Sequence, residues 1–66
     1  MLITKTSNLT GKINSREIPV TAEAYEAWRT RRDTRMVQDA FPELSAEDRE
    51  FLLSGITPEE WSAAFD

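Results

Sequence analysis

The chain contains no cysteine and no histidine in its 66 residues, and this absence constrains its fold more than any other feature of the sequence. A chain of this length buries only about 60% of the surface that its unfolded state exposes, so its hydrophobic core is small. Small domains often add disulfides or a structural zinc ion, and both need side chains that are missing here. We therefore expect one domain, stabilised by close helix packing or by a second chain.

Residues 1–20 predict a β-hairpin. Two segments rich in Ile, Thr and Val, residues 2–7 and 12–20, flank a short loop that contains Asn and Gly, which is typical of two strands joined by a turn. The apolar residues of the second segment do not keep to one face, which favours a bulge near residues 14–16. Pro19 cannot donate a ladder hydrogen bond, so we expect it at a strand end or edge.

Residues 21–66 predict three or four short helices, of which three begin after a capping residue. The predicted N-cap residues are Thr21, Ser45 and Thr57. Thr57 and Glu60 have the spacing of a capping box, and Gly55 is expected to end the helix that Ser45 begins. Large aromatic side chains on these helices are predicted to form most of the core. They are Tyr25, Trp28, Phe41, Phe51, Trp61 and Phe65.

Together these patterns predict an α+β fold, a single domain of residues 1–66 in which the hairpin, residues 1–20, packs against the helical part, residues 21–66. The N-terminus lacks the apolar stretch of about seven residues or more that a secretory signal needs. No apolar run approaches the roughly 20 residues that span a bilayer. With no cysteine to oxidise, the chain suits a reducing compartment. We expect a cytoplasmic protein that does not enter a membrane.

Charge is distributed unevenly along the chain. Residues 1–38 carry seven positive and four negative side chains, whereas residues 39–66 carry eight acids and only Arg49. The densest positive stretch consists of Arg29, Arg31, Arg32 and Arg35. These arginines could bind phosphates of nucleic acid or of a nucleotide. We favour the alternative that they pair with Glu26, with Asp33 and with the acidic C-terminal helices, because dedicated nucleic-acid domains are basic overall.

The acidic residues do not predict catalysis. With neither His nor Cys, the chain lacks the usual base for a nucleophile, and its two glycines form no phosphate loop. Neighbouring carboxylates, which could serve acid–base or Mg²⁺ chemistry, occur at Glu47, Asp48, Glu50, Glu59 and Glu60. Because these acids lie near predicted helix starts, we favour the interpretation that their negative charges complement the helix dipoles. The alternative is an acidic surface that meets the basic groove of a host enzyme. We expect no enzyme, no metal and no cofactor.

The segment from residue 36 to 61 reads MVQDAFPELSAEDREFLLSGITPEEW and resembles a family of short, mostly uncharacterised proteins of bacteriophages, prophages and other mobile elements. The matching motifs are VQDAFPELS at 37–45, DREFL at 48–52 and GITPEEW at 55–61. The resemblance covers nearly the whole chain and implies a phage context, without assigning an activity. Residues 29–35 depart from the family pattern, which is shorter there, contains Gly and is less basic.

We expect a phage-type accessory protein that binds a host macromolecule, such as a defence or replication enzyme, and inhibits it by occlusion. A first alternative is a phosphate-binding module for nucleic acid or a signalling nucleotide, built on the arginines of residues 29–35. A second is a structural role in a virion or small oligomer. The small core and the exposed strand edge favour a homodimer.

Overall fold

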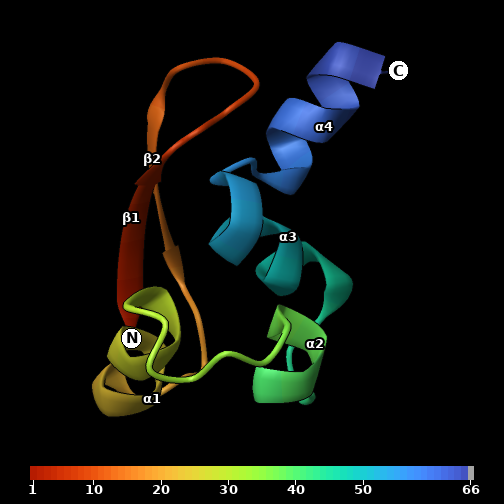
Figure 1. The fold of residues 1–66 in the computed structure, drawn as a ribbon. Coiled ribbons are helices and arrows are strands. Elements are labelled where there is room, and N and C mark those ends of the chain that lie inside the picture. Colours follow the sequence, from red (N-terminus) through yellow and green to blue (C-terminus); the bar gives the residue numbers. More distant parts are fainter. Residues whose placement is uncertain (66) are drawn as a thin grey trace.

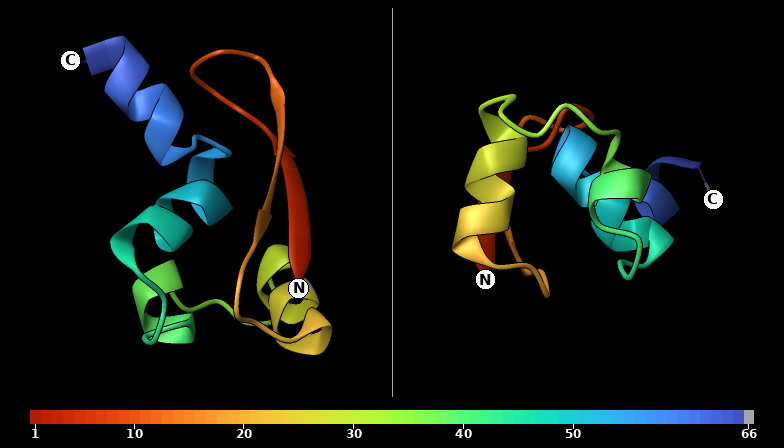
Figure 2. Two further views of the ribbon diagram at one scale, coloured as in Figure 1. Left: turned by 180° about the vertical axis from the view of Figure 1, so that it is seen from behind. Right: turned by 60° about the horizontal axis from the view of Figure 1, so that its bottom comes forward.

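The β-hairpin and the first helix beside it lie on one side of the molecule, and the later helices lie on the other, in an α+β fold as expected (Figure 1). The structure is a computed structural model that describes residues 1–65. Along the chain the elements are β1 (Leu2–Thr6), β2 (Ile13–Glu17), α1 (Ala22–Arg29), α2 (Val37–Ala40), α3 (Ala46–Ser54) and α4 (Pro58–Phe65). Helix α4 leads away from the other helices at one end of the molecule (Figure 2). Within residues 1–65, no helix has the length and apolarity needed to cross a lipid bilayer.

The hairpin is a regular antiparallel pair, so the predicted bulge is wrong. Leu2 lies opposite Glu17 and Thr6 lies opposite Ile13, with one-to-one pairing between them. The ladder stays regular because the inward positions of β2 are held by polar contacts with the helical side. The Asn14 Nδ2 donates to the carbonyl of Gly55 at 3.0 Å. Ile13 is left on the outer face, 75% exposed, and Pro19 follows the end of β2, as predicted.

The predicted helix caps are confirmed. The hydroxyl of Thr21 accepts from the Ala24 N–H at 3.1 Å, and that of Ser45 accepts from the Asp48 N–H at 3.2 Å. Gly55 ends α3 in the left-handed conformation, with φ of +74°. These contacts satisfy backbone groups that a helix end leaves without partners, so α1 and α3 begin where the sequence predicts. Helix α2 follows Met36, which makes no side-chain capping hydrogen bond.

The core lies between the inner face of the hairpin and helices α1 to α3. Phe51 and Leu52 of α3 are almost fully buried, as is Ile18 just beyond β2. Trp28 is half-buried and meets Phe41 edge to face, with ring centroids 5.9 Å apart. The other buried apolar side chains are Ile3, Tyr25, Val37, Leu44 and Ile56 together with Phe41. The predicted core aromatics of residues 25–51 are therefore confirmed.

The prediction that Trp61 and Phe65 belong to the core is wrong. Trp61 is 39% exposed and Phe65 is 66% exposed, and no described residue of α4 is buried. Their rings lie 4.8 Å apart and pack mainly on each other. The core is already closed by Ile56, which is buried immediately before α4 begins. Helix α4 therefore carries its aromatic side chains on the surface.

Candidate binding surfaces

Two of the four predicted arginines are neutralised within their own segment. Arg29, at the end of α1, places its Nη2 2.5 Å from the Glu26 Oε1, and Arg35 places its Nη2 2.7 Å from the Asp33 Oδ2. The Arg35 side chain and its backbone N–H both donate to Asp33, and these hydrogen bonds lower the pKa of the Asp33 carboxyl to about 2. Pairing of the arginines with Glu26 and Asp33 is confirmed.

Arg31 and Arg32 behave differently from their neighbours. Neither makes an ion pair within the part of the chain that the structure describes, so the predicted pairing with the acidic C-terminal helices is wrong. The Nε of Arg32 donates to the Thr30 hydroxyl at 3.3 Å. Arg31 has φ of +67°, in the left-handed region that non-glycine residues rarely occupy. Although adjacent in the sequence, the two arginines therefore differ in backbone conformation and in hydrogen bonding.

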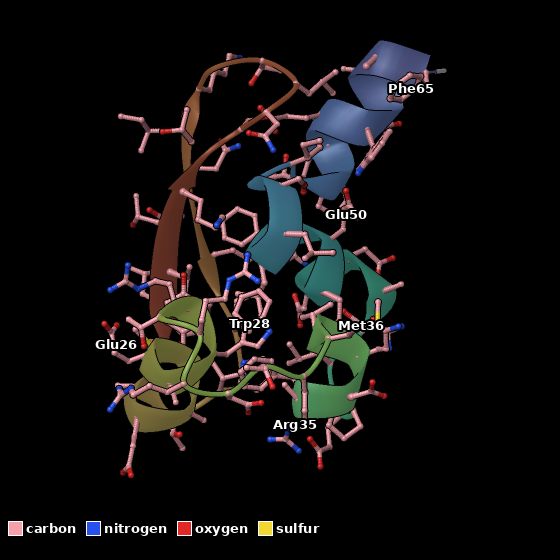
Figure 3. All side chains as sticks on the ribbon, viewed as in Figure 1. Glu26, Trp28, Arg35, Met36, Glu50 and Phe65 are labelled. Atoms are coloured by element: carbon pink, nitrogen blue, oxygen red, sulfur yellow. The ribbon has the colours of Figure 1, made fainter. Side chains whose placement is uncertain are left out.

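A cavity of about 470 Å³ lies between this loop, α3 and β1. We call it the basic cavity, and its charged lining residues are Lys5, Arg29, Arg31, Asp33 and Arg35. Its apolar wall includes Trp28, which projects from the α1 side, and Leu53 (Figure 3). Arg32 does not line the cavity. The sequence did not predict the contribution of Lys5, because the fold brings β1 against a loop more than twenty residues away.

Two of the five predicted acidic residues have ion-pair or hydrogen-bond partners within the fold. Asp48 lies 2.8 Å from the Nε of Arg16, with 15% of its side chain exposed, and so ties α3 to the hairpin. Glu60 accepts from the Thr10 hydroxyl at 2.5 Å and from the Asn14 amide at 2.9 Å. Both carboxylates join the hairpin to the helical part, which makes their role structural.

Of the three other acids, Glu47 and Glu50 line a hollow on the helical side, whereas Glu59 does not. Glu47, Glu50 and Glu59 make no ion pair within residues 1–65. Glu47 and Glu50 line a hollow of about 330 Å³ beside Trp61. Glu47 lies in the first turn of α3 and Glu59 in that of α4, as predicted, whereas Glu50 lies further along α3. We call Glu47, Glu50, Trp61 and Phe65 the acidic aromatic face.

The aromatic side chains of the two surfaces lie apart on the molecule. Phe65 is near the free end of α4, whereas Trp28 and Arg35 lie at the opposite end beside α1 and the loop (Figure 3). Each surface therefore has its own charge sign and its own aromatic group. The two adjoin on α3, where Glu50 and Leu53 line one further hollow.

The described residues contain no group of three or more acids that could hold a metal ion together. No family model matches the chain, and comparisons with curated proteins and with solved structures give no significant match.

Proposed function

We propose that this chain is a small phage-type accessory protein that binds a host macromolecule and inhibits it, for instance a defence or replication enzyme. It acts in the cytoplasm of the bacterial host by occupying a surface of its target, without catalysis of its own. The resemblance of residues 36–61 to proteins of phages and mobile elements supports a host target.

The observation that carries the proposal is the pair of exposed aromatic side chains on α4. Trp61 and Phe65 stack on each other at 4.8 Å while remaining 39% and 66% exposed. Exposed apolar groups that gather on one face mark interaction sites. Trp is enriched among the few residues that supply most of the binding energy in protein interfaces. The acidic aromatic face therefore has the composition of a protein-binding surface.

The acids beside Trp61 favour a basic partner. Glu47 and Glu50 line the hollow together with Ile56, Pro58 and Trp61. A lysine or arginine of the partner would lay its aliphatic stem on the apolar wall and bring its cation to the carboxylates and the indole ring. Because Glu47 and Glu50 make no ion pair within residues 1–65, they also attract a positive surface from a distance. A host enzyme with a basic nucleic-acid groove meets both requirements.

The test is affinity capture from host lysate, followed by titration of each captured protein in purified form. Replacing both Trp61 and Phe65 with Ser should weaken binding by about thirtyfold or more, as expected for the loss of about 2 kcal/mol at an interface hot spot. The matched control is Leu2→Ser, which removes a 63% exposed apolar side chain from the hairpin.

Capture that is equal for the wild type and the double variant would contradict the proposal, provided that circular dichroism shows the same helix content in both. Equal losses in the double variant and in Leu2→Ser would indicate nonspecific apolar adhesion, which also contradicts it.

A further inference from the structure

The basic cavity holds two positive charges that the fold does not neutralise. Arg29 and Arg35 are paired with acids, but Lys5 and Arg31 make no ion pair among residues 1–65. Lys5 is half-buried on the inner face of β1, and Arg31 comes from the loop after α1. Two cations from separate elements thus line one cavity. Their charge matches a phosphate monoester, which carries between about one and a half and two negative charges at neutral pH.

The backbone conformation of Arg31 places this residue at the cavity. Its φ of +67° lies in the left-handed region, which L-residues rarely adopt and which glycine adopts freely. The loop is fixed by hydrogen bonds from the N–H of Arg31 to the Trp28 carbonyl at 3.2 Å and from the N–H of Asp33 to the Ala27 carbonyl at 2.9 Å. The same conformation ends α1 directly after its C-cap residue Thr30, and it holds the unpaired Arg31 at the wall of the cavity.

The uncharged residues of the cavity wall indicate which chemical group the ligand carries besides its phosphate. The cavity of about 470 Å³ falls within the range of roughly 300–1,000 Å³ that is typical of small-molecule sites. A free phosphate would fill little of it and would leave the apolar groups Trp28, Met36 and Leu53 uncovered. Thr34 and Gln38 also line the cavity and offer hydrogen bonds to a polar edge. A flat heterocycle with apolar faces and polar edges suits this wall.

We propose that the basic cavity binds a mononucleotide, with its phosphate on Lys5 and Arg31 and its base against Trp28. A nucleic-acid strand is a poorer match, because the cavity offers only two uncompensated cations and the chain has a net charge of −4. This site is separate from the acidic aromatic face and does not depend on the binding function proposed for it.

The test uses Trp28 as the probe. In a Trp61→Phe background, Trp28 is the only tryptophan, so its emission reports on the cavity alone. We expect AMP or GMP to change this emission saturably, and adenosine, guanosine and inorganic phosphate to bind at least tenfold more weakly. The proposal is overturned if neither AMP nor GMP shows saturable binding up to millimolar concentration.

Two adjacent arginines provide the matched comparison. Arg31→Gly should weaken nucleotide binding by about tenfold or more, since it removes a charged hydrogen-bond donor, while glycine suits the φ at that position and keeps the loop folded. Arg32→Gln removes the same charge one residue away, outside the cavity, and should change affinity less than twofold. Equal losses in the two variants would indicate a diffuse charge effect and overturn the site. Tighter binding of a single-stranded oligonucleotide than of the mononucleotide would overturn it in favour of nucleic acid.

Discussion

At the scale of single residues, Glu60 connects three parts of the chain through one carboxylate. It accepts from the Thr10 hydroxyl, from the Asn14 amide and from the backbone N–H of Thr57. The hydrogen bond from Thr10, more than the others, holds the pKa of Glu60 below its usual value of 4.5. A carboxyl whose pKa is lower in the folded state stabilises the fold above its unfolded pKa, and this contribution is lost as the pH falls through the lowered value.

We therefore expect Glu60→Gln to melt at a lower temperature than the wild type at neutral pH, because the amide is a weaker acceptor. The difference should begin to narrow as the pH falls below 4.5 and should disappear once the pH has passed the lowered pKa of the folded state, where the wild-type carboxyl is itself protonated. Thermal melts across this pH range measure both effects. Glu59→Gln, at an exposed neighbour without an ion pair in the described structure, is the control. A melting difference that does not depend on pH would contradict the prediction.

The two glycines give a second prediction at the residue scale. Gly11 and Gly55 have nearly the same φ, +78° and +74°, but a Cβ on Gly55 would lie 2.5 Å from the Thr6 carbonyl oxygen, whereas one on Gly11 would meet nothing within 4 Å. Gly11→Ala should lose only the conformational term of about 1–2 kcal/mol. Gly55→Ala should lose clearly more, because the hairpin must also move away from α3. Urea denaturation compares the two, and equal losses would show that the close approach carries no cost.

Residue contacts were predictable from the sequence only where they are local. Glu26 and Arg29 lie three positions apart on one helix, so their pairing follows from helix geometry. The entry of Lys5 into the basic cavity depends on how the loop after α1 folds back over β1, which no local pattern encodes. For the same reason the sequence placed the four arginines in one group, although only Arg31 both lines the cavity and lacks an ion pair within residues 1–65.

At the scale of the elements, α4 depends on its capping box. The Thr57 hydroxyl accepts from the Glu60 N–H at 3.2 Å, and the Glu60 carboxylate accepts from the Thr57 N–H at 3.1 Å. Since no described residue of α4 is buried, this cap and the contacts of Glu60 with the hairpin do much of what packing does for the other helices.

Thr57→Ala should reduce the free energy of unfolding by about 1 kcal/mol, which in a domain of this size lowers the melting temperature by about 4–8 °C. Thr57→Ser keeps the acceptor oxygen and should lose much less. Calorimetry on the two variants checks the prediction. An unchanged melting temperature in Thr57→Ala would mean that α4 contributes nothing to the cooperative fold.

The sequence predicted where the helices begin and end. It did not predict which helix faces are buried against other elements. Ser45, Gly55 and Thr57 act on backbone groups within a few residues of themselves, so their roles are written in the local sequence. The apolar spacing of Trp61 and Phe65 gives one face of a helix, but it does not say whether another element covers that face. Within residues 1–65 no element buries that face of α4, and Trp61 and Phe65, predicted to be core residues, become part of the candidate binding surface.

At the scale of the whole molecule, the sheet of two strands has one edge that the helices leave open. Helix α3 contacts β1, and Gly55 lies against the Thr6 carbonyl. The hydrogen-bonded pairs at both ends of the hairpin, Met1 with Ile18 and Ser7 with Lys12, set the alternation of the ladder. Because hydrogen-bonded and non-hydrogen-bonded pairs alternate along the ladder, the backbone N–H and C=O groups of three β2 residues point away from β1. They are Ile13, Ser15 and Glu17, and all three have exposed side chains.

An open strand edge in a small domain is a site for strand addition, so we expect two copies to pair through β2. Antiparallel pairing centred on Ser15 would place Ile13 of one copy opposite Glu17 of the other and build a four-stranded sheet with two-fold symmetry. Sedimentation equilibrium at tens of micromolar should then give twice the 7.6 kDa of one chain. Backbone pairing of this kind should persist in high salt, because it does not rely on exposed charges.

Two substitutions at one position separate this interface from others. Ser15→Pro removes an outward N–H that the hairpin does not use and should give a folded monomer. Ser15→Ala loses the same side-chain contact, the 2.7 Å hydrogen bond with Thr4, but keeps the N–H and should stay dimeric. A dimer that dissociates in salt would instead indicate that the basic half of one chain meets the acidic half of its mate. A mass of 7.6 kDa throughout would mean that the edge of β2 stays unpaired, because Glu17 and the N-terminal amine bound to it at 2.9 Å place enough charge beside the strand to keep a second copy away.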